Sequence, residues 1–151
     1  MTEASDHTDM INETRGGFNE ALGLRFTRVT SDEVVAEVPV GPHLLQPYGL
    51  VHGGVLASMV ETLCSVGAAI DAMARGKTTV GLENSTSFLR ATRSGRLLGR
   101  ATPVHRGRRT QVWGVEIRDD AGELVATGRV RMMVLDEGAA LAGKTVGMQT
   151  G

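Results

Sequence analysis

The sequence predicts one α+β domain in which an antiparallel sheet wraps around a single long helix. A chain of 151 residues with 41% hydrophobic content is long enough for one hydrophobic core and too short for two. One apolar segment, from residue 54 to about residue 75, has the length of a long helix and ends at Gly76. In the rest of the folded chain, apolar and polar residues alternate as they do in β-strands. We therefore expect a single domain over residues 11–136.

Before the long helix, three short elements are expected. Residues 1–10 are polar and without periodicity, which predicts a flexible N-terminal tail. Residues 11–22 carry apolar positions at helical spacing and stop at a glycine, so a short helix is expected there. Residues 24–30 and 33–40 alternate apolar and polar residues around a turn, and therefore predict a β-hairpin.

Four strand-like segments follow the long helix and are separated by three turns, each of which contains glycine. They are residues 79–89, 97–105, 110–118 and 124–135. Residues 137–151 are rich in Gly, Ala and Thr without periodicity, which predicts a flexible C-terminal tail.

Composition excludes several kinds of function. With 16 basic and 17 acidic residues the formal net charge is −1. The chain therefore has no overall positive electrostatic field that would attract nucleic acid or an anionic membrane. Cys64 is the single cysteine, which excludes an intramolecular disulfide and a cysteine-rich metal site and suits a reducing cytoplasm. The N-terminus lacks the pattern of a signal peptide, and polar residues interrupt the long apolar segment. We expect a cytoplasmic protein with neither a metal nor a membrane partner.

The long helix carries a narrow polar stripe. Ser58, Glu61, Thr62 and Ser65 follow the spacing i, i+3, i+4, i+7 and therefore share one helix face. A solvated face is the ordinary interpretation, but small hydroxyl groups replace the Lys, Arg and Gln of such a face. The stripe also begins at Gly54, at a helix N-terminus whose free N–H groups attract negative charge. A lined pocket with Glu61 as its carboxylate fits this pattern better.

The spacing of this stripe predicts a dimer. Gly54 and Glu61 are seven residues apart, about 10 Å along a helix axis, too far for both to touch one reacting carbonyl. Two copies with antiparallel helices would place the N-terminus of one beside the carboxylate of the other. We therefore expect an obligate homodimer with two shared sites.

A family resemblance rests on several motifs. They are Gln46-Pro47-x-Gly49-x-x-His52-Gly53-Gly54, then Glu61 and Ser65, the segment 81–90, the turn His105-Arg106-Gly107-Arg108, and residues 119–126. Over roughly residues 22–135 the chain resembles the hotdog-fold acyl-CoA thioesterases. Within these it is similar to the branch that contains the phenylacetate-pathway and Arthrobacter-type 4-hydroxybenzoyl-CoA thioesterases.

The resemblance implies catalytic roles for five residues. The backbone N–H of Gly53 would polarise the thioester carbonyl, and His52 and Gln46 would shape the same site. Glu61 of the facing subunit would act as nucleophile or as general base on water, two routes that the sequence leaves open. Ser65 would help to hold the attacking water or the carboxylate.

The resemblance also implies a substrate-binding surface. Arg90, Gly107 and Arg108, beside Phe88, would hold the phosphates of coenzyme A, although exposed arginines at strand ends are commonly just solvated. The acyl pocket would be lined by Met59, Leu63 and Asn84, and the low aromatic content hints at aliphatic or mixed acyl groups. Coenzyme A is part of the substrate, so no separate cofactor is expected. Many relatives pair two dimers into a tetramer.

Other interpretations stay open at this stage. His52 could be only a turn residue, Gln46 could bond only its own loop, and Cys64 is interpreted as a core residue. A non-catalytic acyl-CoA or acyl-carrier binding protein would need no carboxylate in the helix. A hotdog hydratase or dehydratase is disfavoured, because that family relies on an Asp and His pair in the loop before the helix.

Overall fold

The computed structural model describes residues 2–147. It contains a six-stranded antiparallel sheet in the order β1-β2-β4-β5-β6-β3, with the long helix α3 in its concave side. The helices are α1 (Thr8–Glu13), α2 (Gly16–Leu22), the 3-10 helix η1 (Pro42–Leu44) and α3 (Gly53–Met73). The sheet strands are β1 (Arg25–Val29), β2 (Val34–Pro39), β3 (Lys77–Phe88), β4 (Arg96–Arg106), β5 (Thr110–Arg118) and β6 (Leu124–Asp136). The predicted α+β architecture is confirmed, and β5 has the predicted bounds.

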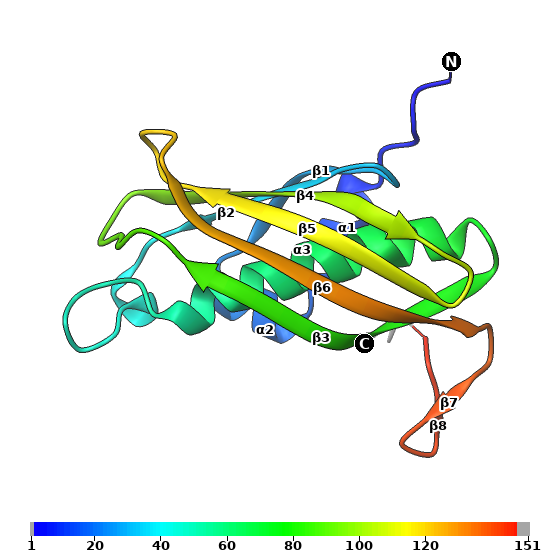
Figure 1. Ribbon diagram of the computed structural model, residues 1–151. Helices are drawn as coiled ribbons and strands as arrows, with labels where there is room; N and C mark the ends of the chain where they lie inside the picture. Colours follow the sequence, from blue (N-terminus) through cyan, green and yellow to red (C-terminus); the bar gives the residue numbers. More distant parts are fainter. Residues whose placement is uncertain (1, 148–151) are drawn as a thin grey trace.

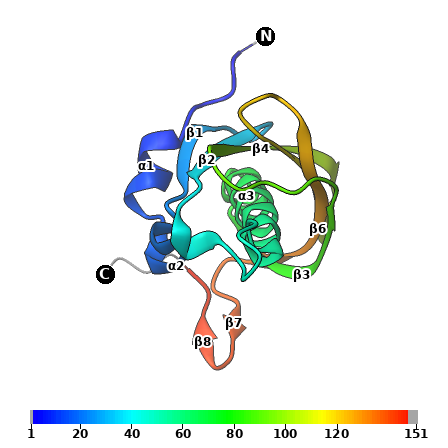
Figure 2. The same cartoon turned by 90° about the vertical axis from the view of Figure 1, so that its left-hand side faces the viewer.

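The core forms where the sheet curls around α3 (Figure 2). Met59, Val60, Leu63 and Cys64 of α3 are completely buried, as the apolar faces of this helix require. Within residues 2–147, α3 is the one helix long and apolar enough to cross a membrane by length and composition. Here that apolar surface is instead covered by the sheet, which explains its composition.

The N-terminal region differs from the prediction of one helix over residues 11–22. The structure has two helices, α1 and α2, because Gly16 adopts a left-handed conformation (φ +77°) that interrupts a helix. Helix α1 begins at Thr8, inside the predicted N-terminal tail. The Thr8 hydroxyl accepts a hydrogen bond from the Val29 backbone (2.9 Å), and the Asn12 side chain donates to and accepts from the backbone of Phe26. These contacts attach α1 to β1.

The predicted C-terminal tail contains a two-stranded hairpin, β7 (Ala140–Leu141) with β8 (Lys144–Thr145). The Val146 N–H donates to the Ala139 carbonyl (2.9 Å) and closes this hairpin. Local backbone pairing therefore forms in a segment without hydrophobic periodicity. The outer ends of both predicted tails, residue 1 and residues 148–151, lie outside the described residues.

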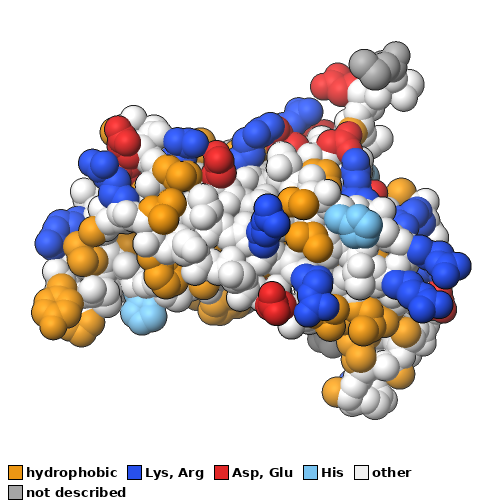
Figure 3. Space-filling view, viewed as in Figure 1, with side chains coloured by type: hydrophobic (Ala, Val, Ile, Leu, Met, Phe, Trp, Pro, Cys, Tyr) orange, Lys and Arg blue, Asp and Glu red, His pale blue; other side chains and the backbone are white. Residues whose placement is uncertain are grey.

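Strand β3 is a long edge of the sheet. Among the described residues it pairs only with β6, and none of its residues is buried. Next to it, the outer face of the sheet carries scattered basic side chains between hydrophobic and uncharged ones (Figure 3). A twelve-residue strand with a free edge offers backbone groups to another chain.

Candidate active site

The N-terminus of α3 presents one free backbone donor. His52 caps the helix, and its Nδ1 accepts a hydrogen bond from the Gly54 N–H (2.8 Å), so the ring proton resides on Nε2. The Gly53 N–H has no hydrogen-bond partner within residues 2–147. A helix N-terminus also carries partial positive charge. The Gly53 N–H is thus the group at this end that is free to bind an oxygen of a ligand.

A tight loop leads into this helix. The Gln46 N–H donates to the Leu50 carbonyl (2.7 Å), and Gly49 turns the chain with φ +76° while its N–H donates to the Gln46 carbonyl (2.9 Å). The Gln46 side-chain oxygen accepts from the Tyr48 N–H. That oxygen therefore stabilises the loop, and the amide NH₂ group of Gln46 is the part that faces other partners.

A cavity of about 310 Å³ lies at this end of the molecule. Its lining includes Gln46, Gly53, Phe88, Arg90 and Thr92, so four of the predicted site residues meet here. The Phe88 ring lies about 3.0 Å from the position that a Cβ on Gly53 would occupy, which explains the glycine. Phe88 itself is 58% exposed.

Thr92 is a polar residue of this cavity that no sequence motif predicted. It is 9% exposed, and its Oγ1 has no hydrogen-bond partner in the structure. An unpaired buried hydroxyl is costly, and such groups commonly mark a place where a ligand or water binds. No periodicity or motif distinguishes Thr92, because its significance comes only from the cavity that it lines.

The carboxylate of Glu61 lies between α3 and β3. Its Oε2 accepts from the Asn84 Nδ2 (3.1 Å), and its Oε1 accepts from the Ser65 Oγ (3.3 Å). The same Asn84 group donates to the Ala57 carbonyl (3.0 Å). A Cβ on Gly81 would lie 2.7 Å from Glu61 Oε1, so β3 approaches the carboxylate closely only because Gly81 lacks a side chain. The structure thus brings Glu61, Ser65 and Asn84 together.

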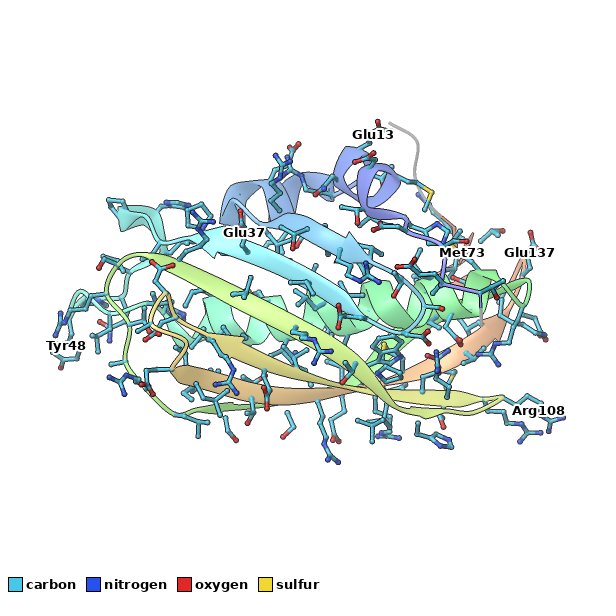
Figure 4. All side chains as sticks on the ribbon, turned by 90° about the horizontal axis from the view of Figure 1, so that it is seen from above. Glu13, Glu37, Tyr48, Met73, Arg108 and Glu137 are labelled. Carbon is cyan, nitrogen blue, oxygen red and sulfur yellow. The ribbon has the colours of Figure 1, made fainter. Side chains whose placement is uncertain are left out.

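One chain does not bring the two halves of the predicted site together. Gly53 and Glu61 are eight residues apart in α3, about 12 Å along the axis. Arg90 lines the cavity at the N-terminal end of α3, whereas Arg108 follows β4 at the opposite end. There the Arg75 guanidinium donates to the Gly107 carbonyl (3.5 Å). Figure 4 shows Tyr48 and Arg108 at opposite ends of the molecule.

Two predicted side chains of the acyl pocket belong to the core instead. Met59 and Leu63 are completely buried on the side of α3 that faces β4, and both approach Gly99. Met59 lies two residues from Glu61, about 200° around the helix, so it points away from the Glu61 side chain. Within one chain these two side chains thus pack in the core on the other side of α3 from Glu61, and their place in an acyl pocket stays a prediction.

Cys64 is buried as the sequence suggested. Burial raises the pKa of its thiol to about 12, so the thiol is protonated at neutral pH and is a poor nucleophile.

Within residues 2–147 no group of three or more His, Cys, Asp or Glu side chains is arranged to hold a metal ion.

The chain matches the profile of the thioesterase superfamily over residues 48–126. A solved structure of a provisionally assigned esterase from Mycobacterium tuberculosis is 43% identical, covers 82% of this chain and 98% of its own, and superposes with a TM-score of 0.78. A solved thioesterase from Haemophilus influenzae is 32% identical, with coverage of 85% and 90% and a TM-score of 0.80.

A 1,4-dihydroxy-2-naphthoyl-CoA hydrolase of Escherichia coli K12 is 36% identical over 114 residues, which is 76% of this chain and 83% of that protein. The family profile begins at Tyr48, in the loop before α3, and spans the whole of α3 and strands β3 to β5, the region that holds Gly53, Glu61 and Asn84. The chain therefore belongs to the thioesterase superfamily, as a thioester hydrolase with the hotdog fold.

Proposed function

We propose that the protein hydrolyses acyl-CoA thioesters to a free acid and coenzyme A, with Glu61 as the reacting carboxylate. The observation that carries the proposal is the position of Glu61. It is held by Ser65 and Asn84 between α3 and β3, without a cationic partner among the described residues. A carboxylate that is fixed by neutral donors keeps lone pairs for a water or a carbonyl carbon.

Two chemical routes fit this geometry. As a general base, Glu61 takes a proton from water, the resulting hydroxide attacks the carbonyl carbon, the C–S bond breaks, and the coenzyme A thiolate is protonated. As a nucleophile, the carboxylate itself attacks and a mixed anhydride forms, which water then hydrolyses. In both routes the Gly53 N–H stabilises the oxyanion, and losing one such donor typically costs about 3 to 4 kcal/mol of barrier.

The site requires a second copy of the chain. An antiparallel copy paired along the free edge of β3 would continue the sheet and place Gly53 of the partner subunit beside Glu61. The same arrangement would carry the partner's Arg90 toward the end that holds Arg108. A phosphate-binding surface that is divided within one chain would then form across the dimer. Pairing of two such dimers into a tetramer is compatible with this arrangement.

The cavity at the N-terminus of α3 supplies further binding groups. Gln46 and Thr92, whose buried hydroxyl has no hydrogen-bond partner, line the cavity together with Gly53. The pantetheine arm of coenzyme A has amide groups that bond such partners. We assign Thr92 to binding of this arm.

Glu61→Gln tests the proposal. It keeps the shape and the possible hydrogen bonds of the side chain but removes the base, so turnover of acyl-CoA should fall by more than about 100-fold. Glu83→Gln is the matched control, since Glu83 lies on the same strand that covers Glu61 and only approaches Arg131 (3.9 Å). Steady-state kinetics on aromatic and aliphatic thioesters measures both variants.

Full activity of Glu61→Gln would disprove the assigned role of this carboxylate. If the wild-type protein turned over no thioester at all, an acyl-CoA or acyl-carrier binding protein would be the better assignment. In that case the variant would bind acyl-CoA as well as the wild type does.

A further inference from the structure

A second and larger cavity, of about 610 Å³, begins beside Glu61. It lies between α3, the first half of β3 and the N-terminal helices. Ser65 and Gly81 line it, and these are the two residues that lie against the Glu61 Oε1 atom. Its volume is within the range of small-molecule sites, roughly 300 to 1,000 Å³. A substrate whose carbonyl carbon reached Glu61 would therefore have this cavity directly ahead of it.

The walls of this cavity are mostly apolar. From α3 they include Val66, Ala69, Ile70 and Met73. Of the cationic groups at its rim, Lys77 pairs with Asp136, and Arg15 donates through Nη1 to the Leu24 carbonyl (3.0 Å) while its Nε has no partner. In a cavity of this kind, the burial of a hydrocarbon chain contributes most of the binding free energy.

The length of the cavity sets the size of the ligand. Along α3 it runs from Ser65 to Met73, about 12 Å at 1.5 Å per residue. An extended alkyl chain advances about 1.25 Å per carbon at tetrahedral bond angles. The cavity therefore matches a chain of about nine or ten carbons.

The C-terminal segment lines the far end of the cavity. Glu137, Val146 and Gly147 line the cavity together with Met73, and Figure 4 shows Met73 and Glu137 at the same end of the molecule. The hydrogen bond from the Val146 N–H to the Ala139 carbonyl holds this segment in its turn. A segment that carries no catalytic group thus forms part of the wall.

We infer that this cavity takes the hydrocarbon chain of a medium-chain aliphatic acyl group, with the thioester carbonyl at Glu61 and the chain directed toward Met73. The inference rests on the proposed function for the position of the carbonyl, and it adds the class of acyl group. Aromatic acyl groups find few partners here, since Phe26 is the one aromatic side chain in the lining.

A chain-length series of acyl-CoA substrates tests the inference. In the wild type, kcat/KM should rise from butyryl-CoA to decanoyl-CoA. Ala69→Phe places a ring midway along the cavity and should lower the ratio of kcat/KM for decanoyl-CoA over butyryl-CoA by at least about 50-fold. The same substitution at Ala121, in the exposed turn after β5, is the control and should leave this ratio unchanged.

Met73→Trp is a second variant, at a residue that is 51% exposed and so tolerates a larger side chain. It should lower the ratio of kcat/KM for decanoyl-CoA over octanoyl-CoA by about 10-fold, because it shortens only the far end of the cavity. Thioester hydrolysis with unchanged ratios in both variants would overturn the inference and leave the proposed function standing. Preference for a chain with a terminal carboxylate would also overturn it, since Arg15 Nε is buried without a partner beside this wall.

Failure of the proposed function is distinguishable from failure of the cavity assignment. If the wild-type protein hydrolysed no thioester, binding of decanoic acid by calorimetry would still test the cavity. Binding by the wild type that Ala69→Phe abolishes would support the assignment. Absence of binding would refute it.

Discussion

At the scale of single residues, Gly53 combines a free N–H group with a position that proline can occupy. It is the first residue of α3, its φ is not in the left-handed region, and His52 before it is extended (φ −62°, ψ 133°). Proline fits the first position of a helix and follows an extended residue readily. Gly53→Pro should therefore remove the oxyanion donor and keep the helix.

We expect Gly53→Pro to lower kcat by about 10² to 10³-fold, the usual effect of losing one oxyanion donor. Gly53→Ala is the control, because it adds the same contact with the Phe88 ring but keeps the N–H. Steady-state kinetics and thermal melting compare the two variants. An equal loss in both would show that the contact with Phe88, and not the donor, matters.

Thr92 permits a second test at this scale. Thr92→Val removes the unpaired Oγ1 and nearly keeps the volume, so the free protein should lose no stability, while KM for acyl-CoA should rise about 5- to 10-fold. Thr92→Ser should retain a low KM, because it keeps the hydroxyl. A destabilised Thr92→Val with unchanged KM would mean that the hydroxyl bonds to the protein itself.

At the scale of elements, the contact between α3 and β5 depends on Gly67. A Cβ at Gly67 would lie 2.5 Å from the buried ring of Trp113, whose Nε1 donates to the Gln111 side chain (2.8 Å). Gln111 in turn donates to Asp71 at the end of α3 (2.9 Å). The buried Trp113 ring is therefore linked through Gln111 to α3 and has little freedom to move.

Gly67→Ala should lower the free energy of unfolding by about 1 to 3 kcal/mol, the usual cost of overpacking a core. Gly17→Ala is the matched control, since it lies in α2 with open space around it and should be neutral or stabilising by up to about 1 kcal/mol. Urea titration measures both variants. Equal stability of Gly67→Ala and the wild type would show that α3 shifts to accept the methyl group.

At the scale of the whole molecule, a site shared across a dimer predicts complementation. Glu61→Gln lacks the carboxylate and Gly53→Pro lacks the donor, but a mixed dimer has one site with both groups intact. Random association of equal amounts gives half mixed dimers, each with one of two sites restored, and hence about a quarter of wild-type activity. Mixing refolded chains and assaying hydrolysis measures this.

Absence of recovery in a mixture that does form mixed dimers would place both groups in one chain. That result would require α3 to bend, because about 12 Å of helix separate Gly53 from Glu61.

The helices and strands of this protein are predictable from the sequence where local backbone geometry determines them. Helical spacing put Glu61 and Ser65 on one face of α3, and alternation located the six strands of the sheet to within a few residues. The break at Gly16 was missed because a left-handed glycine leaves no trace in hydrophobic periodicity.

The chain by itself thus determined the helix, the strands and the residues of the reacting groups, since each is encoded in neighbours a few positions apart. Only the tertiary structure decided that Asn84 holds Glu61, that Met59 faces the core, and that Thr92 is left with a free hydroxyl. The large cavity beside Glu61 likewise exists only after α3, β3 and the C-terminal segment have met. These features depend on which residues the register of the sheet brings opposite α3, and spacing along the chain does not contain that information.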